Sequence, residues 1–136
     1  MDPALLDTDI LNEVLKSRND RVLLRSVAYI REHHRFSISS MTRYEILRGL
    51  KEKNAQIQLA RFDEFCKNSL IEPISDSVLD RSSDLWVKAR ALGREGRDAD
   101  LIIAATAIEL DRVLVTGNAK DFDWIPGLRI EDWRYG

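Results

Sequence analysis

Residues 98–116 read DADLIIAATAIELDRVLVT, and this stretch decides the fold class. After two opening aspartates, segment 98–110 is apolar on nearly every side of a helix, which predicts a helix buried in the core. The alanines near its middle would let its backbone approach a sheet closely. The apolar run RVLVT at 112–116 follows at once and is typical of a buried strand. A buried helix that leads directly into a buried strand predicts an α/β domain.

The rest of the chain repeats this alternation of short apolar runs with longer periodic stretches. Strands are expected at the run that ends with Leu5 and Leu6 and at residues 35–39, 70–74 and 128–130. Helices are expected up to about Lys16, from Asp20 onward, over 40–53 and 57–69, and in a long segment that ends near Gly93 and Gly96. This order predicts a central, mostly parallel sheet of four to five strands flanked by helices. No linker-like tract or internal repeat interrupts residues 1–136, so we expect one domain.

Two of the expected helices carry apolar residues at helical spacing, which predicts the face that each one buries. In the helix that starts at Asp20, this face would hold Val22, Leu23, Val27 and Ile30. In the long helix before Gly93, it would hold Leu79, Leu85, Trp86, Ala89 and Leu92.

Composition excludes several classes of protein. The chain has 136 residues, of which 44% are hydrophobic and 32% charged, enough apolar side chain for one core. No run approaches the roughly 20 apolar residues of a membrane span, and the acidic start Met1-Asp2-Pro3 is unlike a signal peptide. The lone cysteine, Cys66, suits a reducing compartment, so we expect a cytoplasmic protein. The net charge of −2 argues against a surface that coats nucleic acid broadly.

Acidic residues lie at corresponding places around the expected strands. Asp7 comes directly after the first strand, Glu45 lies in the first turns of the helix after the second, and Asp98 and Asp100 open the buried helix. Because strand ends and helix starts of an α/β sheet meet at one edge, we expect Asp7, Glu45 and Asp100 to share a cleft. Crowded carboxylates repel one another, and a divalent cation removes that repulsion. Oxygen-only ligands with no matched cysteine or histidine favour Mg²⁺ or Mn²⁺.

Each acid also has a purely structural interpretation. Asp7 or Asp9 can cap the first helix. The Thr-x-x-Glu motif that ends at Glu45 fits a capping box, in which the glutamate would bond a free backbone N–H. Asp98 is a good helix cap, and Asp100 lies where the helix dipole favours an anion. The residues alone leave both interpretations open.

The turn after the strand at 112–116 adds polar candidates at the same edge. Asn118 could bond a metal-bound water, and Asp121 could be a further carboxylate ligand. Gly117-Asn118 is also a good turn pair, so turn-building is an equal alternative.

Basic residues flank the acids in the sequence; they are Arg43, Arg48, Lys51, Arg94 and Arg97. One interpretation is a solvated helix face. The other is a local rim that binds phosphate around an acidic metal centre.

Four segments, in order and correctly spaced, resemble PIN-domain nucleases, and among them the VapC-like toxins of type II toxin–antitoxin systems. LLDTDIL (5–11) is similar to the first strand with its catalytic aspartate, and ISSMTRYEILRGL (38–50) to the segment with the catalytic glutamate. The most specific match is residues 98–122, and IPGLRIEDW (125–133) is similar to the usual C-terminus. The resemblance covers essentially the whole chain and implies a single PIN-like nuclease domain over residues 1–136.

The resemblance implies that Asp7, Glu45 and Asp100 form the catalytic, metal-binding core. Asp98 lies two residues before the matched aspartate and is a further candidate ligand. Where the family often has a fourth acid, this chain has Asn118, with Asp121 nearby. The resemblance also implies a Mg²⁺- or Mn²⁺-dependent endoribonuclease with an RNA substrate, a small antitoxin partner and a homodimeric state.

Two other functions fit some of these residues. Asp7 and Asp9 match the Asp-x-Asp of haloacid-dehalogenase-type phosphatases, but Ile10 and Leu11 stand where those enzymes have Gly-Thr. A PIN-like module that binds RNA or protein without cutting would account for Asn118 in place of an acid. It would not account for three mutually repelling carboxylates.

Overall fold

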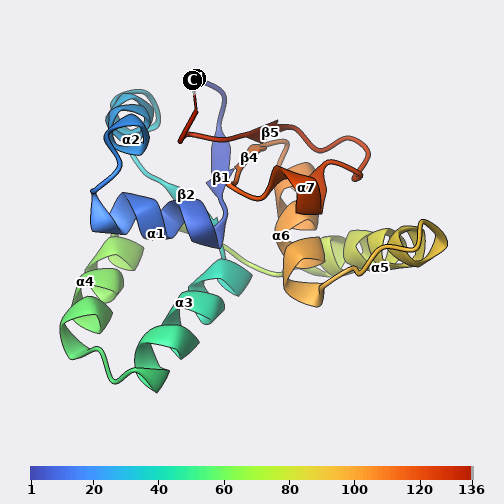
Figure 1. Cartoon of the computed structure of the whole chain (residues 1–136), viewed down its shortest axis with the longest axis horizontal. Coiled ribbons are helices and arrows are strands. Elements are labelled where there is room, and N and C mark those ends of the chain that lie inside the picture. The colour runs from blue at the N-terminus through green and yellow to red at the C-terminus, as the bar shows by residue number, and fades with distance from the viewer. Residues whose placement is uncertain (136) are drawn as a thin grey trace.

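The computed structural model describes residues 1–135, and Figure 1 shows their course from the N-terminus (blue) to the C-terminus (red). Along these residues, five short strands alternate with seven helices. The strands are β1 (Ala4–Leu6), β2 (Ser37–Ser39), β3 (Leu70–Glu72), β4 (Val113–Val115) and β5 (Ile130–Glu131). The helices are α1 (Thr8–Lys16), α2 (Asp20–His33), α3 (Ser40–Glu52), α4 (Gln56–Lys67), α5 (Asp76–Ala91), α6 (Asp98–Glu109) and α7 (Ala119–Phe122). The expected α/β order is confirmed; α7 was not expected, because Gly117-Asn118 signals only a turn.

Every strand pairing within residues 1–135 is parallel, as expected. β4 lies between β1 and β5, with Leu114 opposite both Leu5 and Ile130. β2 pairs with β3, with Ile38 opposite Ile71, and these two strands form a separate small sheet. β2 packs beside β1, so the predicted sheet is present in two adjoining pieces.

A side-chain contact joins the two pieces where backbone pairing does not. Arg112, directly before β4, donates from Nη1 to Glu72 Oε1 of β3 at 3.0 Å. The same nitrogen donates to Ser37 Oγ of β2. Both side chains of the Arg112–Glu72 pair are largely buried, so this contact fixes β2 and β3 against the larger sheet.

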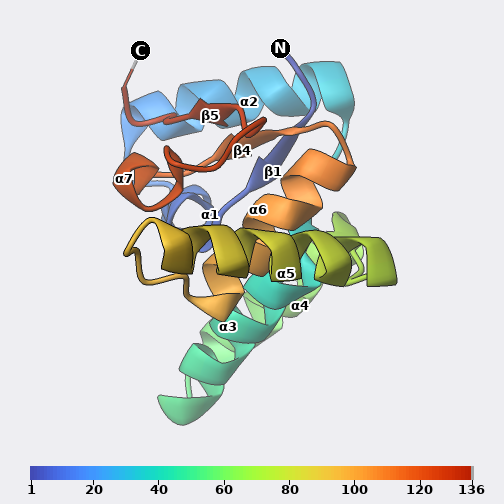
Figure 2. The same cartoon turned by 90° about the vertical axis from the view of Figure 1, so that its right-hand side faces the viewer.

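The three-stranded sheet separates two cores, because successive side chains of a strand point to opposite faces. Leu5 and Leu114 belong to the core under α5, α6 and α7. Leu6 and Val115 belong to the core under α1 to α4, together with Trp133. Figure 2 shows α5 and α6 on the near side of β1 and β4, and α2 on the far side.

The buried helix α6 is confirmed. Its residues from Ile103 to Ala107 are almost completely inaccessible to solvent, and Leu101 is 2% exposed. Small alanines let α6 pack closely against both the sheet and α5. No helix in the described part of the chain is both long and apolar enough to cross a membrane.

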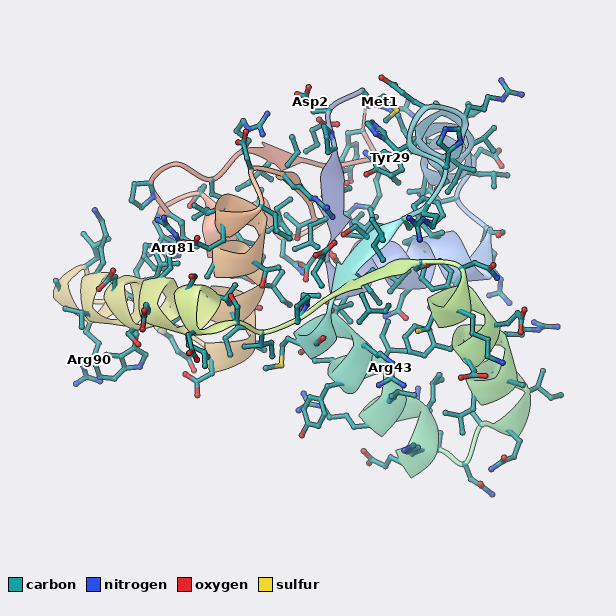
Figure 3. All side chains as sticks on the ribbon, turned by 180° about the vertical axis from the view of Figure 1, so that it is seen from behind. Met1, Asp2, Tyr29, Arg43, Arg81 and Arg90 are labelled. Atoms are coloured by element: carbon teal, nitrogen blue, oxygen red, sulfur yellow. The ribbon has the colours of Figure 1, made fainter. Side chains whose placement is uncertain are left out.

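The predicted buried face of α2 is confirmed at Val22 and wrong at Leu23 and Val27. Val22, Ser26 and Tyr29 are buried, whereas Leu23 and Val27 are exposed. Tyr29 can be buried because its hydroxyl accepts a hydrogen bond from the Ala4 backbone N (3.0 Å) and donates one to the Ala4 carbonyl (3.3 Å). Tyr29 thereby supplies hydrogen-bond partners to backbone groups at the edge of β1, where β1 pairs with no other strand. Figure 3 shows Tyr29 near the start of the chain.

The predicted buried face of α5 is confirmed at Leu85 and Ala89 and wrong at the other three positions. The buried side chains are Val78, Ser82, Leu85 and Ala89, a helical spacing that admits a serine. Leu79, Trp86 and Leu92 are exposed instead. Ser82 fits this face because its hydroxyl donates to the Val78 carbonyl within the helix (2.7 Å) and needs no other partner.

Candidate active site

The end of β1 and the starts of three helices meet at one edge of the sheet. In Figure 1, the first turns of α1, α3 and α6 converge around the end of β1 that leads into α1. This is the carboxyl edge of the parallel strands, where sites form in α/β folds. Each helix start carries one of the three acids that were expected to share a cleft.

Asp7 is buried at the junction of β1 and α1, and it is only 6% exposed. Its Oδ1 accepts a hydrogen bond from the Thr8 backbone N (2.8 Å), which makes it the cap of α1, and its Oδ2 accepts from Thr116 Oγ1 (2.8 Å). Burial raises the pKa of Asp7 to about 7, helped by repulsion from Asp9 and Asp100, although both hydrogen bonds oppose the rise. A nearby cation would therefore stabilise the ionised form of Asp7.

Glu45 approaches from α3. Thr8 Oγ1 donates to Glu45 Oε1 at 2.9 Å, so a residue of α1 orients the carboxylate of α3. Arg48 lies 3.8 Å from the other carboxylate oxygen. The capping-box interpretation is wrong, because Ser39 caps α3 through two backbone N–H groups. The Glu45 carboxylate is therefore not used to cap the start of α3.

Asp100 and Asp98 lie on different sides of α6. Asp100 is half-buried; burial raises its pKa, and the charges of Asp121 and Glu45 raise it further. Asp98 instead lines an apolar groove between α5 and α6. Its interpretation as the helix cap is wrong, because Arg97 holds the cap position and makes no capping side-chain bond. The structure thus brings Asp100, and not Asp98, toward the other acids.

Asp9 anchors the loop between β4 and α7. Its Oδ1 accepts from the Ile10 backbone N (2.8 Å). Its Oδ2 accepts from the Gly117 backbone N (2.9 Å) and from Asn118 Nδ2 (3.1 Å). Asp7, and not Asp9, caps α1. Asp9 therefore positions the loop, and the Asn118 amide is turned toward it.

Asp121 faces Asp100 across the start of α6. Its charge raises the pKa of Asp100, and both residues line one cavity of about 230 Å³ between α6 and α7. Of the two polar candidates after β4, Asp121 therefore lies toward Asp100, whereas Asn118 bonds Asp9.

A contact that was not expected from the sequence ties the C-terminal segment to the same loop. Arg134 Nη2 donates to the Gly117 carbonyl (2.8 Å) and to Asp132 Oδ2 (2.9 Å). The Arg134 charge lowers the pKa of Asp9, whereas burial raises it with larger effect. An aspartate and an arginine two residues apart near a C-terminus form no recognisable motif, so only the fold reveals this role.

Replacing Gly117 by alanine is expected to lower the free energy of unfolding by about 1–3 kcal/mol. A Cβ at this position would lie 2.5 Å from Asp9 Oδ2 and 2.7 Å from Arg134 Cζ, so it would force apart the groups that hold the loop. Gly49→Ala is the matched control: open space surrounds that position within α3, and the change should raise stability by about 0.5–1 kcal/mol. Urea unfolding of both variants would refute the steric argument if their shifts had the same sign.

The basic residues expected at this edge separate into two groups. Arg94 and Arg97 line the cavity that holds Asp100. Arg48 pairs with Glu45, and Arg43 lies on the side of α3 toward α4 (Figure 3), where its charge lowers the pKa of the Cys66 thiol against the larger effect of burial.

The acids interact through their charges but do not form a finished metal site. Among residues 1–135, no three His, Cys, Asp or Glu side chains lie close enough together to hold an ion as they stand. The donor set nevertheless fits a divalent cation, because it consists of carboxylate oxygens alone. Burial and mutual repulsion raise the pKa of Asp7 and of Asp100, and a cation between these residues would relieve that repulsion.

Known proteins share this fold and about a quarter of its sequence. Ribonuclease VapC1 of Haemophilus influenzae (strain R2866) is 27% identical over 132 residues, which cover 95% of this chain and 96% of the relative. The tRNA(fMet)-specific endonuclease VapC of Salmonella typhimurium is 26% identical over 130 residues, with the same coverage. A structure of VapBC2 from Rickettsia felis, bound to a DNA fragment from its promoter, matches with a TM-score of 0.86 and 25% identity, covering 96% of this chain and 98% of that one. The family model described as PIN domain matches residues 4–127, most of the chain, which therefore belongs to the PIN domain family.

Proposed function

We propose that this chain is a metal-dependent endoribonuclease that hydrolyses RNA phosphodiester bonds and is the toxin of a toxin–antitoxin pair. The observation that carries the proposal is Asp7, an acid buried at the carboxyl edge of the sheet, whose pKa rises to about 7 among other acids. Names of relatives with the same fold support the RNA substrate, since these include a ribonuclease and a tRNA-specific endonuclease.

Asp7, Glu45 and Asp100 are proposed to hold Mg²⁺ or Mn²⁺, with Asp121 as a further carboxylate beside Asp100. Asp98 is left out, because it lines the groove on the α5 side of α6. A divalent cation, when bound, lowers the pKa of water and neutralises charge on phosphate oxygens. No side-chain nucleophile is then required.

The chain's own residues hold these carboxylates ready. One oxygen of Asp7 accepts a hydrogen bond from Thr116 and the other from the Thr8 backbone N, while the Thr8 hydroxyl donates to Glu45. Both carboxylates are therefore held in fixed orientations. Asp9 fixes the loop that carries Thr116 and Asn118. Charge repulsion among these carboxylates favours a cation over a neutral ligand at this site.

The proposed partners follow from the same relatives. The structural neighbours include VapBC complexes from Rickettsia felis and Salmonella typhimurium. We therefore expect a small cognate antitoxin to bind this chain, and we expect the chain to act as a homodimer of single nuclease domains spanning residues 1–136. Action in the cytoplasm suits the lone Cys66, which is half-buried and unpaired in the described residues.

A phosphatase that uses Asp9 as its acid or base is disfavoured. Both oxygens of Asp9 already accept hydrogen bonds from the backbone of its own helix and of the loop. A catalytically silent PIN-like module that binds RNA or protein remains the alternative that the next experiment excludes or supports.

The test is cleavage of a whole cellular RNA pool by the purified full chain, with Mg²⁺, with Mn²⁺ and with EDTA. We expect discrete new RNA ends that require the metal, mapped by sequencing of 5′ ends. A full pool is used because a selective enzyme would ignore a generic oligonucleotide. An unchanged pool in both metals would refute the nuclease proposal and favour the silent module.

A further inference from the structure

The cavity of about 230 Å³ between α6 and α7 connects the acidic site to basic residues. Its charged lining consists of three acids, Glu95, Asp100 and Asp121, and three cations, Arg94, Arg97 and Lys120. Its size lies below the roughly 300–1,000 Å³ of pockets that enclose whole drug-sized ligands. It therefore suits one unit of a chain whose neighbouring units lie outside.

Two of these cations form no close ion pair in the described part of the chain, although the Arg97 charge reaches Asp100 and opposes the rise that burial causes in its pKa. Arg97 and Lys120 take part in no ion pair among residues 1–135. Arg81 and Arg112, by contrast, pair with glutamates at 2.6 and 3.0 Å. Unpaired cations beside a cavity are available to an anion that a ligand brings.

Trp124 gives the same cavity a flat aromatic wall. Its Nε1 donates to the Asp121 carbonyl at 2.9 Å, which holds the indole beside α7. Arg94 Cζ lies 5.9 Å from the ring centroid, and Arg94 is itself held by the Lys120 carbonyl (3.3 Å) and by Asp123 (3.7 Å). Bases of single-stranded RNA stack on aromatic rings and on arginine planes.

We infer that this cavity is a nucleotide subsite of the RNA substrate, directly beside the proposed metal-binding acids. The base lies against Trp124 and Arg94, and the phosphate is held by Arg97 and Lys120. The choice of RNA as the ligand rests on the proposed function. The residues of the cavity would hold the nucleotide next to the phosphodiester bond that is cleaved. Because stacking tolerates any base, we expect this subsite to accept any single-stranded nucleotide.

The first test measures binding without any cleavage. The full chain in EDTA is titrated with adenosine 5′-monophosphate while the indole N–H signals are followed by ¹H–¹⁵N NMR. The signal of Trp124 should move, and those of Trp86 and Trp133 should stay, because they lie on α5 and in the opposite core. Inorganic phosphate and adenosine, each alone, should bind more weakly than the nucleotide.

Arg97→Ala should weaken binding of the nucleotide about tenfold or more and leave binding of adenosine unchanged. Arg90→Ala is the matched control: Arg90 also lies over a tryptophan, 4.8 Å from the Trp86 ring centroid, but on α5 (Figure 3) and outside the cavity. The affinity of the Arg90→Ala variant for the nucleotide should equal that of the unmodified chain.

A second measurement uses a fluorescein-labelled pentamer of adenosine ribonucleotides, again in EDTA. Trp124→Ala should weaken binding about tenfold, and Trp124→Phe should keep most of the affinity because the aromatic face remains. If the nucleotide leaves the Trp124 signal unmoved, or if Arg97→Ala and Arg90→Ala bind it equally, the subsite is refuted. A Trp124 shift caused by a glutamate-rich peptide and not by the nucleotide would assign the cavity to a protein partner. Because no step needs cleavage, these results are independent of the nuclease test.

Discussion

Asp100→Asn is expected to lower the rate of RNA cleavage by at least about a hundredfold, and Asp7→Asn by a similar factor. Each change keeps the shape of the side chain but removes a negative charge from the proposed metal-binding group. Asp7→Asn also disturbs the hydrogen bonds that the buried Asp7 carboxylate accepts from Thr116 and from the start of α1. The measurement is the initial rate of appearance of the mapped RNA ends at a fixed Mn²⁺ concentration.

Asp98→Asn is the matched control for this prediction. It alters an aspartate in the same first turn of α6, but one that faces the groove toward α5. The rate should change by less than about threefold, since the charge is exposed and screened. An equal loss of cleavage rate in Asp98→Asn and Asp100→Asn would contradict a specific role for the Asp100 carboxylate. It would mean that only the total charge at the start of α6 matters. Thermal unfolding of each variant separates loss of chemistry from loss of the fold.

The features that could be predicted from the sequence are those that local pattern decides. Helix α6 is apolar all round, and a helix of that kind has no place except the core. The acids Asp7, Glu45 and Asp100 stand at strand ends and helix starts, and parallel topology alone brings such positions to one edge. Neither step requires knowledge of which side chains touch.

Features that depend on a distant partner could not be predicted. Tyr29 lies on the buried face of α2, where its hydroxyl bonds the edge of β1, and the helix sequence does not reveal this partner. The family resemblance already favours Asp100 over Asp98, but only the packing of α6 against α5 shows that Asp98 faces a different groove. Arg134 reaches a loop far away in sequence, at Gly117.

The metal-free protein is expected to lose stability as the pH rises from about 4 to about 7, and Asp7 is the cause. Burial raises the pKa of Asp7 from 3.8 to about 7, so the folded chain binds this proton more tightly than the unfolded chain does. Below the unfolded pKa both states are protonated, and the contribution of Asp7 to stability is fully present. As the pH rises toward the folded pKa, the unfolded chain alone releases the proton, and the free energy of unfolding falls by up to about 1.4 kcal/mol per pH unit. Urea unfolding in EDTA between pH 4 and 8 measures this slope.

Other carboxyl groups titrate in the same pH range and can raise or lower the stability. Asp7→Asn is therefore needed to isolate the contribution of Asp7 to the free energy of unfolding. The pKa of Asp100 is also raised by burial, whereas hydrogen bonds from Arg134 lower the pKa of Asp132 against the cost of burial. The difference between the unmodified chain and Asp7→Asn cancels these groups, and the variant should be the more stable of the two above pH 7. Saturating Mn²⁺ should then narrow the difference, because an ion that binds only the folded state at a hundred times its Kd adds about 2.7 kcal/mol. This gain is smaller than the roughly 4 kcal/mol that the full rise in the Asp7 pKa costs above pH 7. A variant that is less stable than the unmodified chain in EDTA at pH 8 would show that the Asp7 charge is compensated by the fold itself. The proposed cation would then have no repulsion to relieve, and the same carboxylate would have to be explained as the cap of α1 alone.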